Sequence, residues 1–215
     1  MAEEPLARFN ALPPDEAEAE LLACCATPSW AGAVAAGRPY ATIASVLAAS
    51  DDAFVRMPAA DLSAAVAAHP RIGDRATSNT ARPAASSRDT AGRGESSRVP
   101  PGNEGHLHPD LSGEGAPHAR DGDTRDGEWS RQEQAGVAGA SVDTMAALAA
   151  GNEAYEERFG QVFLICATGL SAAEMLAALR TRLGNDPDTE AKIVREELRK
   201  ITGLRLRKLL GGDGT

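Results

Sequence analysis

The stretch that decides the fold class lies at residues 187–209 and reads PDTEAKIVREELRKITGLRLRKL. Within it a stripe with helical spacing, at steps of four, three and four residues, is formed by Val194, Leu198, Ile201 and Arg205. Side chains at these steps share one face of an α-helix. The stretch therefore predicts a long helix that buries one face.

Helical patterns also occupy most of the remaining chain. Alanine is abundant, the alternation typical of strands is scarce, and residues such as Ser29 and Gly37 mark a helix start and stop around 30–36. Further helices are expected between Pro13 and Thr27, from Pro39 to Leu47, from Pro58 to His69, and at 131–139, 142–157 and 171–183. The prediction is an all-α fold, a single compact domain of about eight helices.

Residues 75–127 differ from the rest of the chain in composition. They contain no Phe, Tyr or Trp, and few large apolar residues of any kind. Such a segment buries too little apolar surface to offset the loss of chain entropy on folding. We therefore expect a disordered polar insertion in one domain formed by residues 1–74 and 128–210, with a flexible tail at 211–215.

Charge and cysteine content narrow the class of partner. The formal net charge is −9 without a long run of like charges, which argues against nucleic acid. No apolar stretch approaches the roughly 20 residues of a membrane helix, and the first residues do not resemble a signal peptide. Cys24, Cys25 and Cys166 cannot all pair with one another and lie in no metal-binding motif. We expect a cytoplasmic protein with reduced thiols and no metal.

His69 is the first candidate for chemistry. Because Pro70 disfavours α geometry in the residue before it, a helix should end at His69, beside the free carbonyls of its last turn. These carbonyls favour the imidazolium form and hence a general acid near neutral pH. The alternative is a histidine that only interacts with the helix dipole.

The run from Trp129 to Gln134, WSRQEQ, holds the second candidate. Ser130 followed three residues later by Glu133 is the pattern of a capping box at a helix start. A capped helix start is also a place where polar side chains and N–H groups meet an anion. Both interpretations remain open.

Arg205 is the third candidate, because a guanidinium on an apolar stripe needs a partner. The planar group could clamp a substrate carboxylate in a bidentate pair. Alternatively it pairs with an internal carboxylate, or its stem packs while its head reaches water. The apolar segment Val162–Gly169, which includes Cys166, is interpreted as buried core.

Taken in order, these motifs resemble the 2-oxo-4-hydroxy-4-carboxy-5-ureidoimidazoline (OHCU) decarboxylase family of urate breakdown. The resemblance covers most of the chain outside the insertion. It rests on Phe9-Asn10, the run AHPRIG at 68–73, Trp129 to Gln134, Asn152 with Tyr155, Arg158 to Gly160, Phe163 to Gly169, Arg182 to Asn185, Glu190, and Ile201 to Leu206.

The resemblance implies an all-helical homodimer without cofactor or metal that turns a small anionic ureidoimidazoline into (S)-allantoin. His69 would be the catalytic acid, and Glu133 and Arg205 the other catalytic residues. The remaining substrate contacts that it implies are Pro70, Ser130, Arg131, Gln132 and Gln134, with the segment Leu164, Ile165, Cys166, Ala167 and Thr168.

The chain departs from the family pattern in two places. Some relatives carry arginine where this chain has Thr168, and the family places the His-Pro and Ser-x-x-Glu-Gln motifs much closer together in sequence. The competing hypotheses are a helical interaction module without activity, whose insertion recruits a partner, and a decarboxylase or lyase for another small ureido acid.

Overall fold

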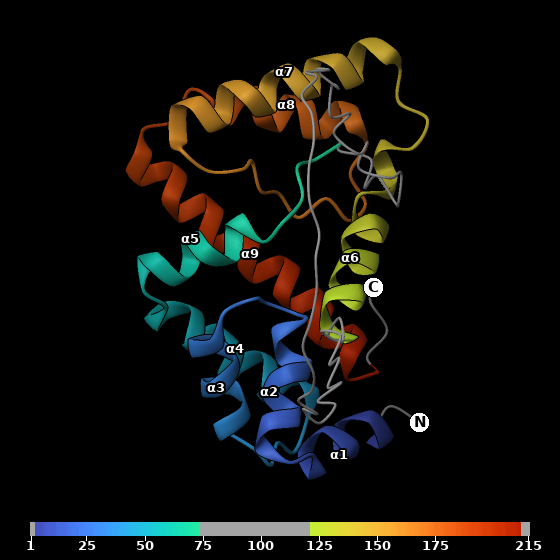
Figure 1. The fold of residues 1–215 in the computed structure, drawn as a ribbon, viewed down its shortest axis with the longest axis vertical. Helices are drawn as coiled ribbons and strands as arrows, with labels where there is room; N and C mark the ends of the chain where they lie inside the picture. Colours follow the sequence, from blue (N-terminus) through green and yellow to red (C-terminus); the bar gives the residue numbers. More distant parts are fainter. Residues whose placement is uncertain (1–2, 74–120, 212–215) are drawn as a thin grey trace, which may run out of the picture. The chain divides into compact units, whose positions relative to one another are not determined.

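Helices form every regular element of residues 3–73 and 121–211, the part of the chain that the computed structural model describes (Figure 1). This confirms the all-α prediction. In chain order the elements are α1 (Glu3–Ala11), α2 (Pro14–Leu22), α3 (Pro28–Ala36), α4 (Ile43–Arg56), α5 (Ala59–Ala67), α6 (Asp121–Glu133), the 3-10 turn η1 (Ala135–Val137), α7 (Val142–Phe159), α8 (Ala172–Arg182) and α9 (Pro187–Leu209).

Local chemistry explains where several helices begin and end. Pro187 occupies the first turn of α9, where its missing N–H costs nothing, and the side chain of Asp186 accepts from the N–H of Thr189. Ser171 and Glu174 form a capping box at the start of α8. Gly160 ends α7 with a φ of 67°, a left-handed conformation that favours glycine.

Two expected helices are wrong in their bounds. The helix predicted from Pro39 begins instead at Ile43, because Thr42 and Ser45 cap it in a reciprocal box. The helix predicted at 131–139 is instead the end of α6 followed by η1. A Cβ atom at Gly136, within η1, would come within 1.8 Å of the Leu170 carbonyl oxygen, so only glycine fits at this position.

Two further elements were not expected in these places. α1 is absent from the predicted set, and α6 begins at Asp121, so residues 121–127 of the expected insertion are helical. α6 is hard to recognise because its first turns are polar and contain glycine. The rest of the expected insertion, residues 75–120, lies outside the described residues, as does the expected tail beyond Gly211.

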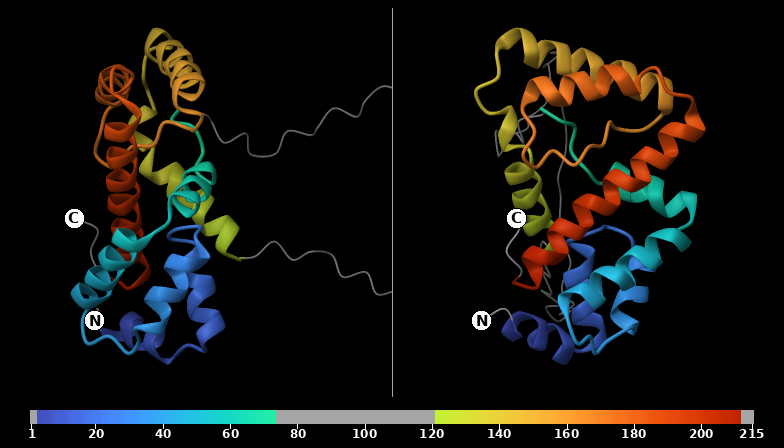
Figure 2. Two further views of the ribbon diagram at one scale, coloured as in Figure 1. Left: turned by 90° about the vertical axis from the view of Figure 1, so that its left-hand side faces the viewer. Right: turned by 180° about the vertical axis from the view of Figure 1, so that it is seen from behind.

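Two groups of buried side chains form the core, and α9 connects them. The first group lies among α1 to α5 and includes Trp30 and Phe54, each 1% exposed. The second group gathers around α7 and α8, which pack against each other. The Val194–Leu198–Ile201 stripe of α9 belongs to the first group, whereas Glu190, in the first turns of α9, bonds residues of α7 and α8. Figure 2 shows α9 running from the region of α7 and α8 toward the N-terminal helices.

The sequence predicts that no segment of the chain is a membrane-spanning helix. Among the described residues, no helix is both long enough and apolar enough to span a bilayer.

Candidate active site

A small pocket opens where the end of α5, the end of α6, the segment after α7 and α9 meet. Most of its wall is apolar, with a few polar groups, as is common for sites that bind small molecules. Its lining residues are His69, Pro70, Ile72, Ser130, Glu133, Gln134, Leu164, Ile165, Ala167 and Ile201. Many of the residues singled out in the sequence therefore share one cavity.

His69 follows the last turn of α5, as the sequence predicts. Its Nδ1 lies 2.8 Å from the carbonyl oxygen of Ala65 in that turn. A carbonyl oxygen only accepts, so Nδ1 must carry the hydrogen. In the neutral ring Nε2 is consequently the acceptor nitrogen, and in the imidazolium Nε2–H is the second donor. The bond to Ala65 thus sets which nitrogen exchanges a proton.

Side chains of α7 hold the loop that follows His69. Arg71 donates to both carboxylate oxygens of Glu156, from Nε at 2.7 Å and from Nη2 at 2.6 Å. One turn earlier on α7, Asn152 Nδ2 donates to the Ile72 carbonyl oxygen at 2.8 Å. These contacts fix the backbone immediately after the histidine and so limit the positions that its ring can take.

Glu133 forms a buried ion pair with Arg205. Nε and Nη2 of Arg205 donate to its two carboxylate oxygens at 3.0 and 2.9 Å, and Nη2 also donates to Ser130 Oγ at 3.0 Å. The exposed fractions are 8% for Glu133, 1% for Arg205 and 4% for Ser130. A buried guanidinium requires such a partner. Glu133 lines the pocket, while Arg205 lies behind it and is absent from the lining.

The capping-box interpretation of Ser130 and Glu133 is wrong. Both residues lie in the last turn of α6, not at its start, because the helix begins already at Asp121. Their side chains face Arg205 instead of free backbone N–H groups of a first turn. The argument for an anion at a helix start therefore does not apply to this site.

The neighbouring residues of α6 divide between two faces. Gln134 lines the pocket, and its Oε1 accepts from the N–H of Gly73 at 3.2 Å. Arg131 and Gln132 are exposed and outside the lining, and Gln132 accepts from Lys208 Nζ at 3.1 Å. The helical period explains this, because residues 130, 133 and 134 share a face that 131 and 132 do not. The structure does not bring Arg131 and Gln132 into the pocket.

The segment after α7 forms another wall of the pocket. Leu164, Ile165 and Ala167 line the cavity, and Leu164 and Ala167 are each 3% exposed. The interpretation of this segment as buried core is confirmed for these two residues. Cys166 is half-buried and Thr168 is exposed, and neither lines the pocket.

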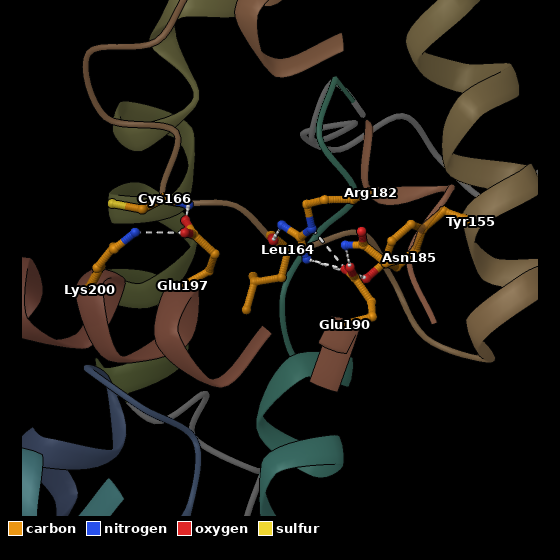
Figure 3. Close-up of polar contacts among 8 residues, drawn as sticks. All are labelled: Tyr155, Leu164, Cys166, Arg182, Asn185, Glu190, Glu197 and Lys200. Atoms are coloured by element: carbon orange, nitrogen blue, oxygen red, sulfur yellow. Dashed lines mark hydrogen bonds and ion pairs between the residues drawn. The ribbon is translucent and has the colours of Figure 1, made fainter. Parts of the chain in front are cut away.

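A network around Arg182 anchors this segment from one side (Figure 3). Arg182 Nη1 donates to the Leu164 carbonyl oxygen at 2.6 Å, while its Nε and Nη2 donate to Glu190 Oε1 at 2.8 and 2.5 Å. Tyr155 Oη also donates to Glu190, and Asn185 Nδ2 donates to its other oxygen at 2.7 Å. The guanidinium carbon lies 4.6 Å from the centroid of the Phe163 ring.

The electrostatics of this network are those of a buried ion pair. Burial works against the charged form of Glu190, but hydrogen bonds from Arg182, Tyr155 and Asn185 outweigh it and hold the pKa of this carboxyl below its usual value. Burial, with the bond to Glu190, raises the pKa of Tyr155. Tyr155 therefore stays a neutral donor and Glu190 a charged acceptor.

Glu197 on α9 anchors the same segment from the other side. Its Oε2 accepts from the N–H of Cys166 at 2.7 Å, and its Oε1 accepts from Lys200 Nζ at 2.8 Å (Figure 3). Burial and the nearby Glu197 carboxylate raise the pKa of the Cys166 thiol. The sequence analysis missed Glu197 and Glu156, since both bond residues far away in sequence and no local pattern marks them.

The described residues offer no ready metal site. No group of three or more His, Cys, Asp or Glu side chains in this part of the chain lies close enough together to hold an ion.

Comparison with known sequences places these features in a family. Residues 10–100 and 106–207 match the family model of the OHCU decarboxylases. The "uric acid degradation bifunctional protein TTL" of Arabidopsis thaliana is 29% identical over 192 residues, which are 89% of this chain and 47% of the relative. Proteins named "2-oxo-4-hydroxy-4-carboxy-5-ureidoimidazoline decarboxylase" from Amia calva and Mus musculus are 37% and 35% identical, each over 51% of this chain and over 62% and 61% of their own lengths.

These matches thus span from about half to somewhat under two thirds of the curated relatives. Among solved structures, an OHCU decarboxylase crystallised in the presence of (S)-allantoin is similar with a TM-score of 0.61 and 26% identity, covering 90% of this chain and 98% of that one. An (S)-allantoin synthase shares the fold, with a TM-score of 0.57 and 14% identity over 95% of this chain and 53% of that one. The family model covers most of the sequence, and the chain belongs to the OHCU decarboxylase family.

Proposed function

We propose that this protein decarboxylates OHCU to (S)-allantoin in urate breakdown, with His69 as the general acid and without a cofactor. The observation that supports this most directly is the meeting of an imidazole and a carboxylate on the wall of one pocket, in a chain of this family. The names of the Amia calva and Mus musculus relatives describe the same activity.

The substrate itself explains why the proposal includes no cofactor. Its departing carboxylate is attached to a carbon next to a C=N bond. When the bond to CO2 breaks, its electron pair forms a C=C bond to the C=N carbon, and the C=N electron pair moves onto nitrogen, which takes up a proton. The enol that results becomes a carbonyl as its hydroxyl proton is lost and a proton is added to the neighbouring carbon, the one that carries the ureido group. The protein has to orient the substrate, stabilise the charge that develops and supply this proton on one face.

In this proposal His69 supplies the proton. Since Nδ1 is bonded to the Ala65 carbonyl oxygen, the proton that the imidazolium transfers comes from Nε2. Because the loop behind the ring is held by Glu156 and Asn152, delivery is restricted to one direction. Protonation of one face of the carbon yields one enantiomer, whereas protonation in water has no preferred face.

Glu133 and Arg205 act as a pair in this proposal. The guanidinium bonds both carboxylate oxygens of Glu133 and fixes their orientation, which suits the carboxylate to accept from the hydroxyl or ureido N–H groups of the substrate. The pair is neutral as a whole, so the imidazolium of His69 leaves the site with a positive charge that favours an anionic substrate. Arg205 itself is absent from the pocket lining, and its Nε and Nη2 bond Glu133 and Ser130, so in this proposal it acts on the substrate through Glu133.

The test is to generate OHCU in situ from urate and to follow the circular dichroism of the allantoin formed, with and without the protein. We expect faster loss of OHCU and an excess of (S)-allantoin. Racemic allantoin formed at the uncatalysed rate would refute the proposal. Turnover of a different ureido acid in a parallel assay would instead identify the substrate class. A homodimer and a cytoplasmic location stay predictions, and light scattering tests the first.

A further inference from the structure

We propose that Glu197 is a positioning residue, which holds the N–H of Cys166 so that the pocket segment, residues 164–167, keeps the shape that binds substrate. The inference rests on the proposed function and goes beyond it, since Glu197 lies outside the pocket lining and is neither an acid nor a substrate ligand.

The two carboxylate oxygens of Glu197 have different partners. Oε1 accepts from Lys200 one turn later on α9, and Oε2 accepts from the Cys166 N–H. The ammonium restrains the carboxylate, and a charged acceptor makes a strong bond to a backbone N–H. The Glu197 side chain is 13% exposed, whereas that of Lys200 is 47% exposed. The residue that bonds the Cys166 backbone is thus the more buried partner of this ion pair.

The pocket segment is held at a second point two residues earlier. Arg182 donates to the Leu164 carbonyl oxygen and is itself fixed by Glu190. Figure 3 shows both anchors reaching the segment from side chains outside it. Ile165, which lines the pocket, lies between the two anchored residues, and Ala167 follows them. A segment fixed at Leu164 and Cys166 has little freedom to turn Ile165 or Ala167 away from the cavity.

The anchors also decide which backbone groups remain for a substrate. The Leu164 carbonyl and the Cys166 N–H are engaged, and the Ala167 carbonyl accepts from the Leu170 N–H at 3.0 Å. Within the described residues no hydrogen bond occupies the N–H groups of Ile165 and Ala167. Loss of the Glu197 bond should therefore displace these two donors and weaken substrate binding more than it slows the chemical step.

The chain provides a matched control at the preceding position. Glu196 also pairs with a cation three residues later, Arg199, at 2.7 Å, and its side chain is 46% exposed. It carries the same charge on the same helix but has no bond to the pocket segment. Glu196→Ala therefore removes an equivalent surface ion pair without touching the anchor.

The experiment compares Glu197→Ala, Glu197→Gln and Glu196→Ala by steady-state kinetics and by NMR exchange of the Cys166 amide hydrogen. For Glu197→Ala we expect roughly tenfold higher KM, a much smaller change in kcat and faster amide exchange. Glu197→Gln should have a KM and an amide exchange rate close to those of the unsubstituted protein, because its amide oxygen still accepts from the N–H. Glu196→Ala should behave as the unsubstituted protein.

Two results would overturn the inference. The first is unchanged KM in Glu197→Ala, whether or not the amide exchange is altered. The second is equal impairment of all three variants with a matching loss of thermal stability, which would indicate a structural role only. Amide exchange needs no substrate, so a protein that fails to decarboxylate OHCU would refute the proposed function while the Cys166 bond is still tested.

Discussion

Replacement of Arg182 by methionine removes the cation from a buried and extensively hydrogen-bonded ion pair. Arg182 is 6% exposed and Glu190 is 1% exposed. The substitution leaves the Glu190 carboxylate buried, with only Tyr155 and Asn185 as donors. Breaking a buried pair by removing one partner costs about 3–5 kcal/mol. For a chain of this size, about 2–4 °C are lost per kcal/mol, so we expect the Tm to fall by roughly 6–20 °C at pH 7.

The loss should depend on pH with a defined sign. In the unsubstituted protein the pKa of Glu190 is below its usual value despite burial, because of its hydrogen bonds. Its contribution to stability is therefore complete above the unfolded pKa, about 4.3, and disappears as the pH falls through the lower folded pKa. Without Arg182, burial dominates and acidification removes an unfavourable charge. The difference in unfolding free energy between the two proteins should therefore shrink from pH 7 to pH 4.5.

Urea unfolding followed by circular dichroism at the two pH values measures this difference. The double variant Arg182→Met with Glu190→Leu is the control, because removal of both charges should recover much of the loss. A single variant within about 1 kcal/mol of the unsubstituted protein at pH 7, or a loss that does not change with pH, would refute the assignment of Arg182 and Glu190 as a stabilising buried pair.

The other predictions concern the site and the chain around it. His69→Ala should abolish enzyme-dependent decarboxylation and keep the helical circular dichroism signal, and full turnover in this variant would remove the imidazole from the mechanism. Arg205→Lys should lower kcat/KM by about tenfold or more, because an ammonium cannot bond both oxygens of its partner, while the free energy of unfolding should change less than the free energy of catalysis. Unchanged kinetics would show that Arg205 has a structural role only. Gly136→Ala should destabilise by several kcal/mol, on the order of 3, because its Cβ would lie 1.8 Å from a carbonyl oxygen, and thermal unfolding measures this. Replacement of residues 76–118 by a Gly/Ser linker of about 15 residues should leave turnover in place, and loss of the fold would show that this segment is structural.

The fold could be predicted where one face of a helix carries a strong period. The stripe of Val194, Leu198 and Ile201 indicates α9 because each of its steps buries a large side chain. α6 carries no such stripe in its first turns, and the contacts of Trp129 and Glu133 lie near its end. The sequence pattern therefore predicts a start for α6 that is too late, and it predicts Ser130 at the beginning of the helix, whereas Ser130 lies in its last turn.

The candidate site could be predicted only in part, for a related reason. His69 and Glu133 stand in short motifs that can be recognised in the sequence, and both residues line the pocket. The residues that hold the pocket in shape act over long distances in sequence. Glu156 bonds a residue 85 positions away, and Glu197 bonds one 31 positions away. Neither contact leaves a local pattern, because the two partners are far apart in sequence. For Glu197 the partner is also a backbone N–H, which every residue except proline possesses.

The cavity takes its imidazole from residue 69 and its anchored carboxylate from residue 133, and that carboxylate is secured by residue 205. Synthesis must therefore reach residue 205 before all three groups are present in one chain. A polypeptide that ends earlier holds the imidazole and the carboxylate but lacks the guanidinium that secures the carboxylate.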